Sequence, residues 1–192
     1  MLRVGVSGDV GSFSEKAAFD YLEKSKLQNF KIQHLLNMEN VLKALNSNEI
    51  DYGVFPVANS EVGLIIPAIN AMGKYQFKLI DTLDINVEHY LFAKKKLAKQ
   101  DIKAIYSFAP AVSQCQKYIS REFSGTTIVD WGDMALAARD LANGLIHDDC
   151  AIIGSKYAAI TYNLEILAEK IQDAVDNKTM FIIVARLDDM GV

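Results

Sequence analysis

The alternation of short apolar runs with helix-periodic segments constrains the fold of this chain more than any other feature. The first run, LRVGVSG at 2–8, precedes a segment in which Ala18, Tyr21 and Leu22 recur at helical spacing. Strands that alternate with helices in this way predict an α/β fold with largely parallel sheets, as one large sheet or two small ones. The predicted strands cover 2–8, 30–36, 51–60, 77–95, 102–108, 126–131, 150–155 and 180–187, and the predicted helices cover 12–27, 38–50, 61–75, 109–123, 132–144 and the segment from 156.

Size and composition are those of an ordinary globular protein. The chain has 192 residues, of which 51% are apolar and 23% are charged. That length suffices for one domain or two small lobes, and the core needs no disulfide or metal to hold it. The two cysteines, Cys115 and Cys150, lack the CxxC spacing and are predicted to be plain buried thiols.

The charge pattern disfavours nucleic acid and membranes as partners. The net charge is −4, and the one basic run, at 93–99, is interpreted as a solvated loop. No apolar run approaches the roughly 20 residues of a membrane span. The amino-terminal residues lack the charged and apolar regions of a secretory signal. We therefore expect a soluble, cytoplasmic protein.

Small polar residues gather where predicted strands end, which is where α/β folds collect their ligands. In the segment 7–15, two glycines precede Ser12 and Ser14 at a helix start, and Ser12 with Glu15 has the spacing of a capping box. The free amide groups of such a turn suit a carboxylate or phosphate, but a plain turn with a capping serine fits equally. Asn59 and Ser60 either fix a polar ligand or cap the next helix.

Other kinds of site find no support in the sequence. The three histidines, His34, His89 and His147, are scattered without metal-ligand spacing. A GxSxG elbow is missing, and Cys115 lacks the surroundings of a catalytic thiol. The sequence predicts no metal and no cofactor.

Four segments together resemble one known family. GDVGSFSEKAA at 8–18 is similar to G-P-x-G-T-F-S-x-x-A-A of the prephenate dehydratases, and DYGVFPVANSEVG at 51–63 is similar to their D-x-G-V-x-P-I-E-N-S-x-E-G. SFAPAVSQC at 107–115 resembles H-P-Q-A-L-x-Q-C, and 151–181 resembles the long segment that ends in N-x-T-R-F. The resemblance covers nearly the whole chain in order.

The resemblance implies two α/β lobes around a central cleft, similar to type 2 periplasmic binding proteins. Lobe 1 would comprise 1–83 with 178–192, and lobe 2 would comprise 84–177. The chain ends soon after the T-x-F segment, so we expect no phenylalanine-sensing ACT domain and no chorismate mutase domain. The family also implies a homodimer.

The chemistry that the resemblance implies is loss of carbon dioxide and water from prephenate, a small carboxylic acid, to give phenylpyruvate. Thr179 matches the threonine of T-R-F, which the family uses to help the ring hydroxyl leave, and is the predicted catalytic residue. The predicted substrate-binding residues are Ser12, Phe13, Ser14, Asn59, Ser60, Asp133, Met180 and Phe181.

The chain departs from the family pattern at polar positions. The arginine of T-R-F is Met180, the glutamate of E-N-S is Ala58, and the family's S-T-A is Asp133-Met134-Ala135. Asp133 places a negative charge near a proposed dianion, and two such charges ~5 Å apart repel by roughly 3 kcal/mol at an effective dielectric of 20.

Three hypotheses follow from these departures. The first is a dehydratase that recruits another cation, such as Lys156. The second is a related enzyme that decarboxylates a similar acid without making the ring aromatic. The third is a non-catalytic ligand-binding module.

Overall fold

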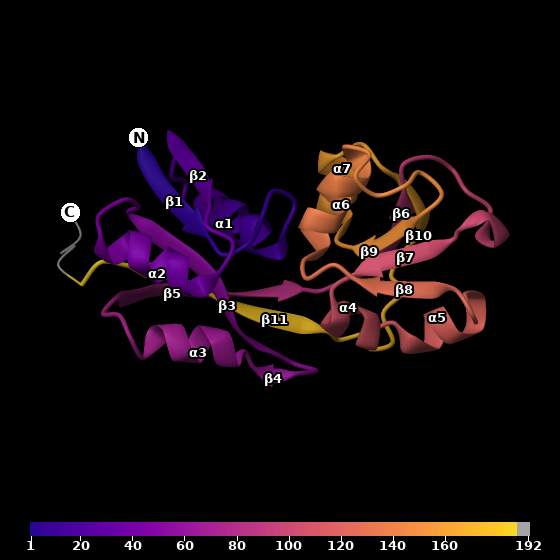
Figure 1. Cartoon of the computed structure of the whole chain (residues 1–192). Helices are drawn as coiled ribbons and strands as arrows, with labels where there is room; N and C mark the ends of the chain where they lie inside the picture. Colours follow the sequence, from indigo (N-terminus) through magenta and orange to yellow (C-terminus); the bar gives the residue numbers. More distant parts are fainter. Residues whose placement is uncertain (188–192) are drawn as a thin grey trace. The chain divides into compact units, whose positions relative to one another are not determined.

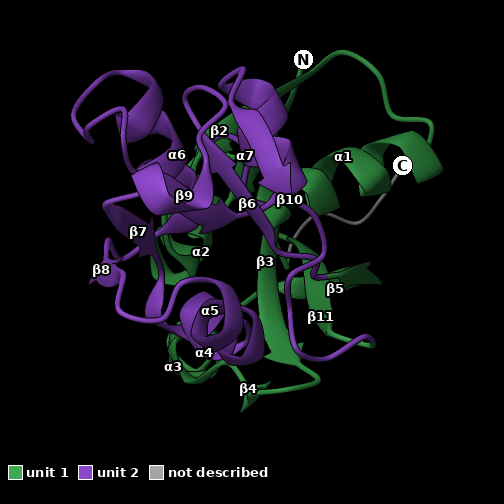
Figure 2. Ribbon diagram, turned by 90° about the vertical axis from the view of Figure 1, so that its right-hand side faces the viewer, with its two compact units in different colours: residues 1–9, 13–86, 176–192 green, residues 10–12, 87–175 purple. Residues whose placement is uncertain are grey.

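The structure is a computed structural model that describes residues 1–187, and the chain packs as two compact units. Unit 1 comprises Met1–Asp9, Phe13–Asn86 and the chain from Asp176, whereas unit 2 comprises Val10–Ser12 and Val87–Val175 (Figure 2). The predicted lobes, 1–83 with 178–192 and 84–177, differ by the segment at 10–12 and by a few residues at each crossover. The division of the chain into these two lobes as separate domains stays a prediction.

Unit 1 is built on a six-stranded mixed sheet in the order β2-β1-β3-β11-β5, with β4 paired to β3 (Figure 1). The pairs β1–β2 and β1–β3 are parallel, but β11 runs antiparallel to both of its neighbours. The expectation of largely parallel sheets was therefore wrong for β11 and β5. The strands are β1 (Leu2–Val6), β2 (Phe30–His34), β3 (Tyr52–Asn59), β4 (Gly63–Leu64), β5 (Lys78–Asn86) and β11 (Lys178–Ala185).

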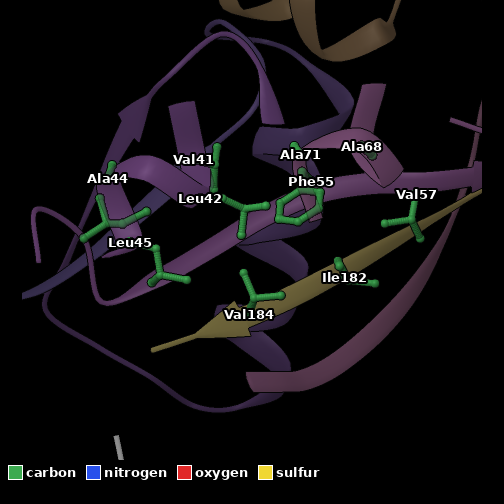
Figure 3. Close-up of a cluster of buried hydrophobic side chains, with 11 residues drawn as sticks. Val41, Leu42, Ala44, Leu45, Phe55, Val57, Ala68, Ala71, Ile182 and Val184 are labelled. Carbon is green, nitrogen blue, oxygen red and sulfur yellow. The ribbon is translucent and has the colours of Figure 1, made fainter. Parts of the chain in front are cut away.

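Helices cover both faces of this sheet. One face packs against α1 (Phe13–Lys24), and the other packs against α2 (Met38–Asn46) and α3 (Ile66–Met72). Figure 3 shows the core on the α2 and α3 face, where Ile182 and Val184 of β11 meet Phe55. Phe181 and Ile183 point to the α1 face, where they join Ile85, Val54 and the buried residues of α1. A strand buried on both faces is apolar without alternation, which explains the run in β11.

The predicted helix at 61–75 was wrong in its first half. Gly63–Leu64 forms β4, and α3 begins only at Ile66, with Pro67 in its first turn, where proline does not interrupt hydrogen bonding. The predicted helix at 38–50 ends at Asn46, because Asn48 adopts a left-handed backbone with φ of 62°.

Unit 2 is built on a five-stranded sheet in the order β10-β6-β9-β7-β8. The pairs β7–β8 and β7–β9 are parallel, and β6 runs antiparallel to β9 and β10. The strands are β6 (Tyr90–Ala93), β7 (Ala104–Ser107), β8 (Thr127–Asp130), β9 (Ala151–Gly154) and β10 (Glu165–Ala168); the helices are the short η1 (Lys99–Asp101), α4 (Ala109–Ser113), α5 (Gln116–Glu122), α6 (Met134–Ala142) and α7 (Lys156–Thr161).

Three predicted elements of this half of the chain need correction. The β-rich run at 77–95 is two strands, β5 and β6, in different sheets. The helix at 109–123 breaks into α4 and α5, and Cys115 leaves the helical conformation between them. The helical segment from 156 ends at Thr161, because Asn163 takes a left-handed backbone with φ of 52° and the chain continues as β10.

The two thiols are buried and free, as the sequence predicted. Burial, with a smaller contribution from Asp173, raises the pKa of the Cys115 thiol to about 12, so that it stays protonated at neutral pH. Within residues 1–187, no helix is long and apolar enough to cross a bilayer.

Candidate active site

Thr179 lies on β11, opposite Asn59 of β3 and Ile85 of β5. Its side chain is 7% exposed and shares the α1 face of the sheet with Phe181, because side chains two apart on a strand point the same way. The hydroxyl oxygen accepts a hydrogen bond of 2.9 Å from the side-chain amide of Asn59. That leaves the hydroxyl hydrogen to donate to a ligand.

Both the nitrogen and the oxygen of the Asn59 side-chain amide make hydrogen bonds. Its nitrogen also donates to the Asn177 side-chain oxygen at 2.7 Å and to the Lys178 carbonyl at 3.1 Å. Its oxygen accepts from the backbone amides of Glu61 at 2.9 Å and Val62 at 3.2 Å. The helix-cap reading of Asn59 was wrong, because β4 follows and α3 begins only at Ile66. Asn59 instead closes the turn after β3 and orients the threonine hydroxyl, and its predicted contact with substrate stays a prediction.

Ser60 ties the end of β3 to the start of β11. Its hydroxyl donates to the Asp176 carbonyl at 3.2 Å and accepts from the Lys178 amide at 2.9 Å. The Ser60 amide donates to the Lys178 carbonyl at 2.9 Å. With these bonds the serine fixes the loop that carries Asn177, and its predicted contact with substrate stays a prediction.

Two buried hydroxyls meet beyond the carboxyl end of β1. Ser7 follows that strand and Ser14 lies in the first turn of α1; their hydroxyl oxygens are 3.0 Å apart. Ser7 is 9% exposed and Ser14 is 6% exposed. Phe13, half-buried, packs against the α1-face core, whereas Ser12 belongs to unit 2. The structure thus assigns the predicted trio Ser12, Phe13 and Ser14 to two different units.

Asp133 is the N-cap of α6. Its carboxylate accepts a hydrogen bond of 2.8 Å from the Leu136 amide, and the positive end of the helix dipole offsets its charge. Serine and aspartate are both strong caps, so an aspartate in place of the family's serine preserves the helix start. Because the helix dipole partly offsets the charge of Asp133, its carboxylate should repel a dianionic ligand less than the sequence alone suggested.

Met180 points away from Thr179. Successive side chains on a strand point to opposite faces, and both residues are paired with β3 and β5 in regular order. Met180 lies directly opposite Ala58 of β3 and Asp84 of β5, and Ala58 is in turn opposite Leu64 of β4. Thr179 and Met180 therefore do not share one wall of a pocket.

This register links two departures from the family pattern. The positions where the resemblance expects a glutamate and an arginine, Ala58 and Met180, are direct cross-strand partners. Facing residues of opposite charge stabilise a sheet, and a lone charge there lacks its partner. Because this chain has apolar residues at both positions, neither position holds a charge without a partner.

A double-mutant cycle tests this pairing. Ala58→Glu should destabilise the wild-type chain more than it destabilises the Met180→Arg variant, in which the new carboxylate faces a guanidinium. The difference between the two losses in free energy of unfolding should be about 0.5–1 kcal/mol. Urea unfolding measures each stability. Leu79→Glu is the matched control, since Leu79 pairs with Val184, far along β11, and should show no coupling to Met180→Arg. Equal coupling in both cycles would contradict the pairing.

A cation of unit 2 is available for an acidic ligand. Lys156, the first residue of α7, is exposed, and its ammonium lies 5.9 Å from the ring centre of Tyr90. The Tyr90 hydroxyl donates to Glu88 at 2.9 Å, and burial together with this acceptor raises the pKa of Tyr90 to about 12. The phenol of Tyr90 therefore stays neutral at physiological pH. Within the described residues, no cluster of three histidine, cysteine or acidic side chains could hold a metal ion.

Sequence reasoning missed two members of this arrangement, Ser7 and Asn177. Ser7 lies at the end of the first predicted strand and begins the polar segment 7–15, which was the signal that could have identified it. Asn177 is buried, at 2% exposure, and contacts Asn59 from 118 positions away in the chain. No local pattern in the sequence indicates that contact.

Comparisons with known proteins show which family this chain resembles. A family model described as prephenate dehydratase matches residues 4–189. A bifunctional chorismate mutase/prephenate dehydratase of Buchnera aphidicola (subspecies Schizaphis graminum) is 30% identical over 182 residues, which are 93% of this chain and 46% of that protein. Arogenate dehydratase/prephenate dehydratase 1 of Arabidopsis thaliana is 30% identical over 186 residues, 96% of this chain and 45% of that protein. This chain therefore spans about half the length of these curated relatives.

Solved structures show the same fold. Prephenate dehydratase of Arthrobacter aurescens, in complex with L-Phe, matches with a TM-score of 0.84 at 24% identity, over 97% of this chain and 60% of that one. A periplasmic substrate-binding protein of an ABC transporter from Coxiella burnetii matches with a TM-score of 0.56 at 17% identity, over 98% of this chain and 86% of that one. The predicted α/β class, similar to periplasmic binding proteins, is confirmed.

Proposed function

Because the chain belongs to the prephenate dehydratase family, we propose that it removes carbon dioxide and water from prephenate to give phenylpyruvate, a step of phenylalanine biosynthesis. The observation that best supports this proposal is the Thr179 hydroxyl, whose oxygen accepts from Asn59 and whose hydrogen is left to donate. A held donor on a buried strand is what a leaving hydroxyl requires.

The chemistry follows from the substrate. As carbon dioxide leaves, the electrons of the broken carbon–carbon bond enter the ring, which becomes aromatic as the hydroxyl departs with its own electron pair. That oxygen takes up one proton and leaves as water. Thr179 donates a hydrogen bond to it, which stabilises the charge that develops in the transition state, and solvent supplies the proton in the overall balance.

The substrate's carboxylates need donors or cations. Ser7 and Ser14 supply hydroxyls beside the first turn of α1, where backbone amides carry partial positive charge. These are the anion-binding groups that unit 1 offers where the chain has Met180 in place of the family's arginine. On unit 2, Lys156 is an exposed cation.

A turnover assay tests the proposal. Purified protein with prephenate should release phenylpyruvate, read from its ultraviolet absorbance in base, and carbon dioxide in equal amount. Lys156→Gln should raise KM, since it removes a cation, while Lys26→Gln, a change at an exposed lysine of unit 1, should not. Phenylpyruvate at no more than the uncatalysed rate would reject the proposal.

A second candidate function is supported by the apolar pair Ala58 and Met180. A member of the family with this pair would bind or decarboxylate a related small carboxylic acid. Carbon dioxide without phenylpyruvate in the same assay would favour a decarboxylase. Thermal stabilisation by a small acid without turnover would favour a binding module, since a ligand that binds only the folded state raises its melting temperature.

Assembly and location are part of the proposal. We infer a cytoplasmic homodimer, supported by the family resemblance. Light scattering of the purified protein at micromolar concentration measures the mass, and a monomer there would reject the dimer.

A further inference from the structure

A groove of about 420 Å³ opens on unit 2, apart from every residue discussed above as part of the candidate active site. Its floor is the apolar core beneath β6, where Leu91 is 1%, Ile102 5% and Phe123 4% exposed. A concave surface of this size with an apolar floor is typical of small-molecule sites.

A local irregularity shapes one side of the groove. In the pairing of β10 with β6, Ile166 faces Phe92 and Ala168 faces Leu91, so Leu167 is an extra residue on β10. A bulge of this kind bends its strand and redirects a side chain. Leu167 packs against the same core and lines the groove, which makes the groove a feature of the strand pairing and not only of surface loops.

Opposite charges lie on the rim. Lys96 comes from the loop after β6 and Glu165 from the start of β10, and both line the groove and are exposed. Among the described residues, neither side chain makes a hydrogen bond or ion pair, whereas the other lysine of the groove, Lys99, pairs with Glu122. The groove therefore offers one available cation and one available anion beside an apolar floor.

We propose that this groove binds an amino acid with an apolar side chain, whose carboxylate meets Lys96 and whose ammonium group meets Glu165. A simple carboxylic acid would satisfy only Lys96 and leave Glu165 without a partner. An amine would do the reverse. The zwitterion satisfies both, and its side chain covers the apolar floor. This inference stands independently of the proposed dehydratase function.

Isothermal titration calorimetry with L-leucine tests the proposal. Saturable binding is expected, with weaker binding of 4-methylpentanoate, which lacks the ammonium group, and of 3-methylbutylamine, which lacks the carboxylate. Glycine, which has no apolar side chain, should also bind more weakly. Absence of binding by L-leucine, or equal affinity for 4-methylpentanoate, would overturn the proposal.

Variants locate the binding. Lys96→Glu should weaken L-leucine binding by on the order of tenfold, since it replaces attraction by repulsion. Lys95→Glu is the matched control, because Lys95 is an exposed neighbour that does not line the groove, and its affinity should stay at the wild-type value. Ala98→Trp should block the groove sterically. Binding that survives both Lys96→Glu and Ala98→Trp would place the amino acid elsewhere and reject the groove.

Discussion

Replacing Thr179 with valine is expected to lower kcat for prephenate turnover by about 10²–10⁴-fold, the usual contribution of a positioned proton donor. Valine keeps the shape of threonine but has no hydroxyl, so the leaving oxygen loses its donor. The fold should persist, because Asn59 still has Asn177 and Lys178 as acceptors. A loss of about 1 kcal/mol in the free energy of unfolding is expected from the missing hydrogen bond.

Controls separate chemistry from folding. Thr179→Ser keeps the hydroxyl and should retain kcat within about tenfold. Thr82→Val makes the same substitution at an exposed position of β5 and should leave kcat unchanged. Steady-state kinetics with circular dichroism on each variant provide both readouts. If Thr179→Val turns over prephenate at the wild-type rate, Thr179 has no part in the reaction.

The second large effect is expected at Gly11, where alanine should lower the free energy of unfolding by about 2–4 kcal/mol. Gly11 has φ of +85°, a backbone that residues with a Cβ atom rarely adopt. An added Cβ would also lie 2.8 Å from the Cα of Ala158 and 3.2 Å from its nitrogen, and backbone atoms of α7 cannot move aside cheaply. The Gly11 carbonyl accepts from Ser155 at 2.7 Å, so a shift would break this bond.

Gly125→Ala is the matched control for this prediction. Gly125 lies in the same unit with φ of +90°, but nothing lies within 4 Å of its missing Cβ. Only the backbone conformation should cost free energy there, about 1–2 kcal/mol. Urea unfolding of both variants gives the difference. Equal losses in the two variants would show that the approach of Gly11 to Ala158 does not matter.

The sequence predicted those parts of the fold that depend on local pattern. The apolar run from Met180 became β11, and the helical spacing of Ala18, Tyr21 and Leu22 became the buried face of α1. The breaks were harder to predict. Asn163 ends α7 with a left-handed backbone, although the residues after it continue to look helical, and pairing of β10 with β6 decides their conformation.

The residues of the candidate site were likewise predictable only in part. Asn59 carried a local signal, because it lies at the end of a predicted strand, whereas the role of Thr179 was predicted from the family resemblance. Their hydrogen bond joins residues 120 positions apart, so only the strand register could reveal it. The register also showed that Met180 faces Ala58 rather than the threonine hydroxyl, a relation that adjacency in the sequence conceals.

The position of β11 between β3 and β5 has a consequence for how the protein is made. The strand between β3 and β5 is supplied by residues from Lys178 onward. During translation, β3 and β5 emerge from the ribosome long before the segment that joins them, so both edges stay open to wrong partners while about half of the polypeptide is added. Residues 87–175 of unit 2, by contrast, have all been synthesised before that last strand appears, and we expect chaperones to protect the earlier edges during the interval.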